Sequence, residues 1–384
     1  MARIFIRSVL YIKQGNEILV KFEKGFLQKN IFNFLSMILV TGGTGLVGTH
    51  LLYELLSGGR DVRALMRGGS NVDLVRRIFL WYDPARGQQY FDNINWAYGD
   101  LNDLFSLRDV LKDVKQVYHC GAMVSFLPQD RELMMKVNVE GTANLVNACL
   151  EAGIDKMCHC SSVAAIGKPE KGSVIEESLV WKTSKQNSWY AISKYGAERE
   201  VWRGSEEGIP TVIVNPSVVI GPGDPGRSSA QLYQSVKNGM KFYTTGITGF
   251  VDARDVATAM VQLMESDITG ERFVLNSENL PYKTLFEYFA EYSGARPPKY
   301  RAGKFLSEIA WRLEKMRSMI TGQKPLLSRE TARNANLRRY YSSEKIQQQL
   351  GFEFRPIREA AKNTSEFFQR YPIHLSPDLR IGEP

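Results

Sequence analysis

The sequence contains little cysteine and no long apolar run. Four of its 384 residues are cysteines (Cys120, Cys149, Cys158 and Cys160), too few for a disulfide framework in a chain of this length. A reducing, cytoplasmic location is therefore expected. No stretch reaches the ~18 consecutive apolar residues that a membrane-spanning helix needs. The N-terminus also lacks the compact apolar segment and small-residue cleavage site of a secretory signal. The hydrophobic content of 43% is nevertheless enough to build a core.

The net charge of +8 is unevenly distributed. Residues 1–36 carry six Lys/Arg and two Glu, and residues 301–384 carry sixteen Lys/Arg against nine Asp/Glu. The middle of the chain is therefore mildly acidic. Basic termini suit an anionic substrate or an anionic membrane surface, although a solvated basic face is the commoner explanation. No nucleic-acid-binding motif accompanies the charge, so we expect no nucleic-acid partner.

Residues 38–48, Ile-Leu-Val-Thr-Gly-Gly-Thr-Gly-Leu-Val-Gly, have the pattern of a dinucleotide-binding turn. Gly42, Gly45 and Gly48 are spaced by three, after a β-branched apolar run and before a helical pattern. Gly42 can take the backbone angles of a tight turn, and Gly45 lets the backbone approach a pyrophosphate. Gly48 lets the following helix pack closely. The stretch predicts a strand, a phosphate-binding turn and the start of a helix.

A second motif carries reaction chemistry. Tyr190 and Lys194 are four residues apart on a predicted helix, so both side chains lie on one face. Upstream, Ser161-Ser162 ends a predicted strand. A tyrosine with a pKa near ~10 is a poor base at neutral pH, but a nearby ammonium favours the phenolate and lowers that pKa. Such a Tyr–Lys pair is common on helices, and it becomes informative here because it follows the glycine motif.

Together these motifs resemble the extended short-chain dehydrogenase/reductase superfamily of NAD(P)-dependent epimerases, dehydratases and reductases. The resemblance runs from about residue 37 to about residue 371. Within the superfamily, the chain is most similar to the branch of dihydroflavonol-4-reductase-like and 3β-hydroxysteroid dehydrogenase-like proteins. This similarity rests on residues 63–67 and 215–224. Further landmarks follow in the family's order, at 99–101, 118–122, 138–142, 215–217 and 249–252.

The resemblance implies four catalytic residues. Tyr190 would be the acid/base, and Lys194 would lower its pKa and hold the nicotinamide ribose. Ser162, rather than Ser161, would hold the substrate oxygen near Tyr190. Asn138 would shape the active-site backbone and a water relay.

The resemblance also implies the cofactor contacts. NAD-preferring members place an acidic residue at the end of the second strand, where this chain has Met66 followed by Arg67. Arg67 could instead pair with a 2′-phosphate, which predicts NADP(H), with NAD as the alternative. Asp100 would contact adenine, and Pro216 and Ser217 would line the nicotinamide. The full predicted set is Thr41, Gly42, Gly45, Leu46, Val47, Gly48, Arg67, Asp100, Leu101, Gly121, Ala122, Tyr190, Lys194, Pro216 and Ser217.

The expected fold is an α/β, Rossmann-type, doubly wound parallel sheet with a smaller, mainly helical C-terminal substrate lobe. Residues 1–36 are an extension, either upstream of the native start at Met37 or a short appended segment. Residues 37–240 form the NAD(P)-binding domain. Residues 241–384 form mainly the substrate lobe, with 250–276 returning to the sheet. Strands are predicted near 37–41, 61–66, 94–98, 115–120, 156–161, 210–216 and 271–276, and helices near 46–57, 104–112, 130–152 and 188–207.

Five C-terminal helices are expected to cap the carboxyl ends of the strands, near 281–293, 303–321, 327–337, 342–349 and 356–370. Helix 303–321 is amphipathic. Such a helix either lies on a membrane surface or, more often, buries its apolar face on its own domain. The family's four-helix dimer interface would make a homodimer through helices 130–152 and 188–207. A long loop at 167–187 would lie beside the active site.

The leading functional hypothesis is an oxidoreductase that interconverts a ketone and a secondary alcohol of a small, partly apolar or anionic molecule. A nucleotide-sugar epimerase with tightly bound NAD is the first alternative, and a non-catalytic nucleotide sensor or assembly factor is the second. Val163-Ala164 replaces the Asp-Glu pair of sugar-nucleotide 4,6-dehydratases, which disfavours that elimination. His119-Cys120 and Cys158-His159-Cys160 offer soft ligands. We predict no metal site there, since buried free cysteine usually acts as a small hydrophobe.

Overall fold

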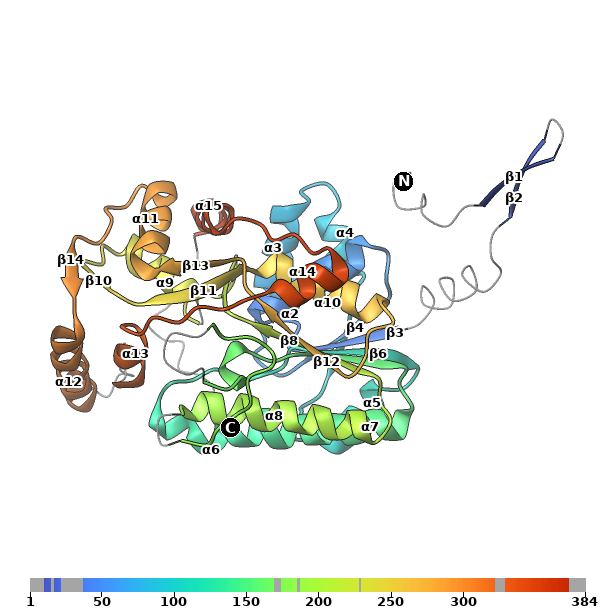
Figure 1. Cartoon of the computed structure of the whole chain (residues 1–384), viewed down its shortest axis with the longest axis horizontal. Coiled ribbons are helices and arrows are strands. Elements are labelled where there is room, and N and C mark those ends of the chain that lie inside the picture. Colours follow the sequence, from blue (N-terminus) through green and yellow to red (C-terminus); the bar gives the residue numbers. More distant parts are fainter. Residues whose placement is uncertain are drawn as a thin grey trace.

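Seven parallel strands form the central sheet, in the spatial order β12-β8-β7-β6-β3-β4-β5 (Figure 1). The computed structural model describes residues 10–14, 17–21, 37–168, 174–184, 187–227, 229–321 and 329–372. The strand order reverses between β3 and β6, which is the doubly wound topology, so the predicted fold class is confirmed. The strands are β3 (Met37–Thr41), β4 (Val62–Met66), β5 (Asn95–Tyr98), β6 (Val114–His119), β7 (Lys156–Cys160), β8 (Thr211–Pro216) and β12 (Glu271–Leu275).

Helices cover both faces of this sheet, so the inner strands β3, β7 and β8 are buried along nearly their whole length. In β3, Ile38 and Val40 face a core shared with α2 (Leu46–Ser57) and α10 (Ala253–Glu265). Leu39 faces the opposite core. That second core is shared with α5 (Leu104–Val110), α7 (Gly141–Ala152) and α8 (Trp189–Glu206). The cores fix the glycine turn after β3 relative to α8.

Shorter elements surround the site. The predicted helix 130–152 is interrupted, because α6 (Arg131–Met135) joins α7 through a π-helical turn, η2 (Lys136–Glu140). A π-helical turn inside a helix often marks a functional position, and here it contains Asn138. The others are α3 (Val72–Tyr82), α4 (Gly87–Asp92) and the 3₁₀ turns η1 (Pro128–Asp130) and η3 (Val163–Ala165).

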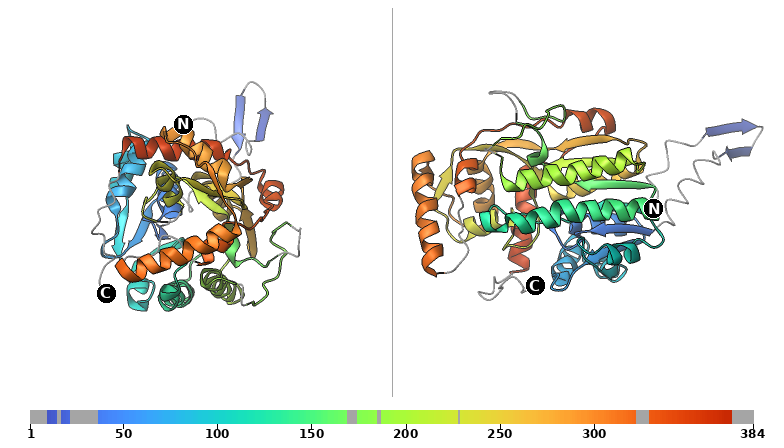
Figure 2. Two further views of the ribbon diagram at one scale, coloured as in Figure 1. Left: turned by 90° about the vertical axis from the view of Figure 1, so that its left-hand side faces the viewer. Right: turned by 90° about the horizontal axis from the view of Figure 1, so that it is seen from below.

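The C-terminal lobe has its own core and lies beyond the carboxyl ends of the central strands (Figures 1 and 2). Tyr233, Phe289 and Phe368 pack together there, with Tyr233 and Phe368 stacked at 4.9 Å between ring centroids. Two small sheets belong to it, β13-β11-β9 and β10-β14. The elements are β9 (Val218–Ile220), β10 (Phe242–Thr244), β11 (Ile247–Asp252), β13 (Glu278–Pro281), β14 (Tyr300–Ala302), α9 (Ala230–Lys237), α11 (Tyr282–Ser293), α12 (Lys304–Thr321), α13 (Arg329–Asn334), α14 (Glu344–Leu350) and α15 (Ile357–Arg370).

One C-terminal helix is placed differently from expectation. The prediction that all five cap the carboxyl ends of the strands is wrong for α14. Its Ile346 is fully buried in the core between the sheet and α10, and α14 contacts the edge strand β12. The helix thus covers sheet surface that β12 would otherwise leave open.

Near the N-terminus, β1 (Leu10–Gln14) and β2 (Glu17–Lys21) pair with each other in an antiparallel sheet of two strands. The rest of the predicted extension lies outside the described residues, so the interpretation of residues 1–36 stays a prediction. Among the described residues, no helix is both long enough and apolar enough to span a membrane.

Candidate active site

The glycine turn between β3 and α2 leaves no room for side chains. Gly42 has a φ of +70°, and a Cβ there would lie 2.6 Å from the backbone nitrogen of Gly121. A Cβ on Gly48 would lie 2.1 Å from the carbonyl oxygen of Gly42. Gly48 thus lets α2 begin directly against the turn. The predicted turn residues therefore meet in one tight structure.

The start of α2 offers free backbone donors. Gly45 is the N-cap, and no side chain caps the helix. The amides of Leu46, Val47 and Gly48 fall in the first turn, where a helix supplies no acceptors of its own. Such amides and the helix dipole attract phosphate, and this helix is 12 residues long. The arrangement can hold a pyrophosphate.

A buried chain of hydrogen bonds joins this turn to Asn138. Thr142 Oγ1 donates to the Asn138 carbonyl at 2.5 Å, so it must accept from His119 Nε2 at 2.9 Å. His119 Nδ1 then accepts from Thr41 Oγ1 at 2.7 Å, and Thr41 Oγ1 accepts from the Gly121 amide at 3.1 Å. Burial lowers the pKa of His119 to about 3, so this ring is neutral. The chain of bonds fixes Gly121 beside the turn.

The adenine side of the site is more open. Arg67 follows β4 and is exposed, with Nη1 4.0 Å from Oδ2 of Asp100 after β5. Asp100 Oδ1 accepts from the Asn102 amide at 2.8 Å, which fixes the loop. Leu101 is buried against Gly121, while Ala122 is exposed. An exposed ion pair this long is weak, so the guanidinium can turn to another anion.

The structure brings Ser162 and Tyr190 together. Ser162 follows β7, its Oγ accepts from the Ala164 amide at 3.1 Å, and its side chain lies close enough to that of Tyr190 on α8 to favour the phenolate. Desolvation outweighs this effect and raises the pKa of Tyr190 to about 12. Ser161 points elsewhere, because its hydroxyl donates to Glu198 at 2.7 Å. The geometry supports the choice of Ser162 over Ser161.

Lys194 is buried one turn after Tyr190, and its Nζ donates to the Cys160 carbonyl at 2.9 Å. Desolvation lowers the pKa of Lys194. The expected lowering of the Tyr190 pKa by Lys194 is not seen in this structure: burial dominates, and the ammonium is turned toward β7. Lys194 would have to share its donors with a ribose to act as the sequence predicts.

Asn138 braces the loop in front of Tyr190. It is buried, its Oδ1 accepts from the Met123 amide at 2.7 Å, and its Nδ2 donates to the Met123 carbonyl at 2.9 Å. Nδ2 also donates to Ser193 Oγ at 3.0 Å, and Ser193 donates to the Tyr190 carbonyl at 2.9 Å. Asn138 therefore links the loop after β6 to α8.

On the nicotinamide side, Pro216 ends β8 opposite Leu275 of β12, and the Ser217 amide donates to the Leu275 carbonyl at 2.9 Å. The hydroxyl of Ser217 is buried without a protein partner.

His119 and His159 lie with ring centroids 4.9 Å apart. Within the described ranges, no group of three or more His, Cys, Asp or Glu side chains could hold a metal ion.

Sequence reasoning missed Glu198, which lies under the site. Glu198 is one turn after Lys194 on the same face of α8 and is buried. It accepts from Ser161 Oγ, from Asn215 Nδ2 at 2.9 Å and from Arg272 Nη1 at 2.9 Å. Asn215 also donates to the Ser162 carbonyl at 3.0 Å. The four-residue spacing of Tyr190, Lys194 and Glu198 is the signal that could have found it.

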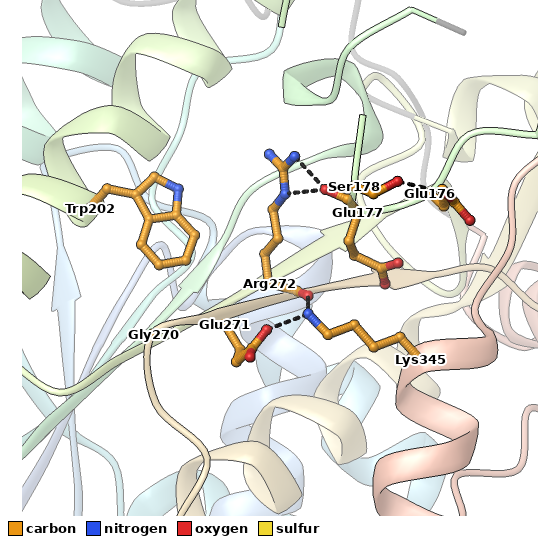
Figure 3. Close-up of a pocket in the computed structure, with 8 residues that line it drawn as sticks. All are labelled: Glu176, Glu177, Ser178, Trp202, Gly270, Glu271, Arg272 and Lys345. Atoms are coloured by element: carbon orange, nitrogen blue, oxygen red, sulfur yellow. Dashed lines mark hydrogen bonds and ion pairs between the residues drawn. The ribbon is translucent and has the colours of Figure 1, made fainter. Parts of the chain in front are cut away.

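Arg272 of the edge strand β12 connects Glu198 to the loop that contains Glu177 and Leu179. Figure 3 shows Arg272 next to Glu177. Its guanidinium donates to the carbonyls of Glu177 and Leu179 at 2.6 and 3.0 Å. The Glu177 carboxylate accepts from the Val274 amide at 2.6 Å. Figure 3 shows Arg272 among the residues lining a pocket near the start of β12, with Trp202 and Lys345. Ser162 and Tyr190 do not line this pocket, so it is not the candidate site.

Comparison with known proteins decides the family. The NAD dependent epimerase/dehydratase family matches residues 38–275. The chain belongs to this family. It is 31% identical to a putative dihydroflavonol 4-reductase of Synechocystis over 86% of this chain and 94% of that protein. It is also 31% identical to sterol demethylase protein B of Methylococcus capsulatus, over 68% of this chain and 76% of that one. The crystal structure of gox2253 shares 32% identity at a TM-score of 0.71, covering 87% of this chain and 98% of that one. The predicted resemblance is confirmed.

Proposed function

We propose that the chain is an NADP(H)-dependent oxidoreductase that interconverts a ketone and a secondary alcohol. The proximity of the Ser162 and Tyr190 side chains, together with a glycine turn that has room for a dinucleotide, carries this proposal. Family membership and the reductase among the relatives support it. With its pyrophosphate held at the turn, the cofactor would supply the hydride from its nicotinamide.

The protein's own part in the reaction is proton transfer. In the reducing direction, Ser162 and Tyr190 hold the substrate oxygen, and Tyr190 donates its proton as negative charge develops there. The pKa of Tyr190, about 12 in this structure, keeps the hydroxyl protonated and ready to donate at neutral pH. Lys194 lies one helical turn away with its ammonium bonded to the Cys160 carbonyl, so it would stabilise the phenolate that remains only after turning toward Tyr190.

The preference for NADP(H) rests on the end of β4. No carboxylate occupies position 66, and the exposed Arg67 makes only a long contact with Asp100. A 2′-phosphate offers a guanidinium a shorter, stronger pair.

The substrate proposal is a mid-sized, partly apolar molecule. Phe126 packs against the ring of Tyr190 at 5.5 Å between centroids, and Val124 and Phe126 are both exposed. An apolar wall next to the reacting oxygen suits an aromatic or alicyclic ketone better than a free sugar. The names of the flavonoid and sterol relatives are in line with this class.

The test of this function is a variant that lacks only the Tyr190 hydroxyl. Tyr190→Phe should leave NADPH binding within a factor of about two and abolish NADPH consumption with a panel of aryl and alicyclic ketones. Tyr288→Phe, on α11, is the matched control and should behave as the unaltered protein. Turnover by Tyr190→Phe at the unaltered rate would refute the assignment.

The epimerase alternative uses the same residues, because a transient ketone needs the same acid/base. It predicts that NAD stays bound through purification and is not consumed. The sensor alternative predicts binding without turnover on any substrate, yet such proteins have no need of the intact Ser162, Tyr190 and Lys194 set. Mass spectrometry of nucleotide released from the purified protein separates the epimerase from the reductase.

A further inference from the structure

Helix α12 turns its apolar side outward. Phe305, Ile309, Leu313, Met316 and Ile320 are spaced by three or four residues, so they form one stripe, and all are exposed. Leu306 and Met319 border the stripe and are exposed as well. We call these seven residues the α12 apolar face. The expectation that this helix buries its apolar face on its own domain is therefore wrong.

The inward side of α12 is polar. Ser307 is buried and accepts from Asn336 Nδ2 at 2.9 Å. Asn336 follows α13, is also buried, and accepts from Thr245 Oγ1 at 3.3 Å. Because hydrogen bonds fix the polar side to the lobe, the helix cannot simply roll to hide its apolar side. Figures 1 and 2 show α12 at one extremity of the molecule, beside α13 and β14.

The protein surface next to the start of α12 is basic. Arg296, Lys299 and Arg301 lead into α12 and are exposed, and residues 294–307 contain no acidic residue. Lys241 is exposed at the start of β10, which pairs with β14. Phe242 and Tyr300 are exposed on that pair, with rings 5.8 Å apart. Aromatic and basic residues beside an apolar helix face are the composition of an interfacial membrane anchor.

The anchor is linked to the entrance of the candidate site. The side chain of Glu330 on α13 lies near that of Ser188, the N-cap of α8. Tyr190 lies two residues further along that helix. Helix α13, which packs beside α12, therefore lies near the start of the helix that carries Tyr190.

We propose that the α12 apolar face docks on the surface of an anionic lipid bilayer. Charge decides between this occupant and a second copy of the chain. A symmetric dimer through the same face would set Arg296, Lys299 and Arg301 of one copy near those of the other, which repels. An anionic bilayer complements the same charges while its acyl region takes up the apolar side chains. The proposal does not depend on the catalytic assignment, because docking is measured without substrate.

The experiment is vesicle flotation of the full chain. Vesicles are phosphatidylcholine alone or with about 30% phosphatidylglycerol, at about 0.1 M and about 0.5 M salt. The test variant is Phe305→Ser/Ile320→Ser, whose side chains are 80% and 81% exposed. The control is Phe105→Ser/Val180→Ser, both 75% exposed outside α12. Neither variant changes charge, and removing exposed side chains leaves the fold intact, which circular dichroism checks.

The unaltered chain and the control should float with the anionic vesicles at least about tenfold more than with the neutral ones, and less at high salt. The α12 variant should lose at least about tenfold in binding. Failure of the unaltered chain to float, or equal flotation of the α12 variant, overturns the proposal. Light scattering tests whether a second copy occupies this face instead. If the unaltered chain is a dimer that does not float, and the α12 variant is a monomer, the α12 apolar face is a dimer interface and the proposal is overturned.

Discussion

Glu198 provides the sharpest test of how the site is supported. Its carboxylate accepts from three buried or half-buried donors, on Ser161, Asn215 and Arg272. Glu198→Gln keeps the shape of the side chain but replaces one of its two acceptor oxygens with an NH₂ group. That group is a donor and faces one of the three donors, which then loses its acceptor. It also removes the buried countercharge of Arg272, whose side chain is only 19% exposed. Breaking such a pair costs about 3–5 kcal/mol, and we expect about 3 because Arg272 keeps its two carbonyl partners.

The assay is urea unfolding, with Glu200→Gln on the same helix as control. Glu200 pairs with Arg203 at the surface, and losing that pair should cost under about 1 kcal/mol. Hydrogen exchange should also rise in residues 174–184, since Arg272 fixes that loop through Glu177 and Leu179. If Glu198→Gln destabilises the protein no more than the control, the ion pair does not hold the site together.

Two further predictions concern backbone space and pH. Gly48→Ala places a Cβ 2.1 Å from the Gly42 carbonyl, so NADPH binding should weaken at least about tenfold; Gly58→Ala, with 3.3 Å to its nearest backbone atom, should leave it unchanged. Equal affinities in a fluorescence titration would refute the packing argument. Burial lowers the pKa of His50 to about 4 and of His119 to about 3. The unfolded chain takes up these protons near pH ~6.5 and the folded chain does not. Each residue should therefore remove about 2 kcal/mol of stability between pH ~6.5 and pH ~5. Burial lowers the pKa of His159 as well, so it adds a similar share. Urea unfolding at both pH values measures this, His50→Gln should reduce the loss by about a third, and a flat profile would contradict it.

Much of the fold could be predicted because its signals are local. Strands such as β3 and β8 are short, mainly apolar runs buried on both faces, which makes them distinct in the sequence. The three-residue strands β9, β10 and β14 carry no such signal, since partners distant in the sequence define them. Helices α3 and α10 were not predicted, although Asn71 and Asp252 cap them and mark their starts.

The candidate site also combines residues with a local sequence signal and residues that only tertiary packing brings together. The glycine turn and the Tyr190–Lys194 spacing are local, so their positions could be predicted. The pair between Glu198 and Arg272 joins residues 74 positions apart and depends on tertiary packing. For α12, the periodicity revealed an amphipathic helix, but the exposure of its apolar stripe and the bond between Ser307 and Asn336, both set by tertiary packing, show which side faces inward.

Calorimetric titration of the full chain with NADPH and with NADH, after checking for nucleotide carried through purification, tests the central claim most directly. The account predicts exchangeable NADPH binding and NADH binding at least about tenfold weaker, with Arg67→Ala removing the difference. NAD that is retained through purification and does not exchange would contradict the account and favour the epimerase.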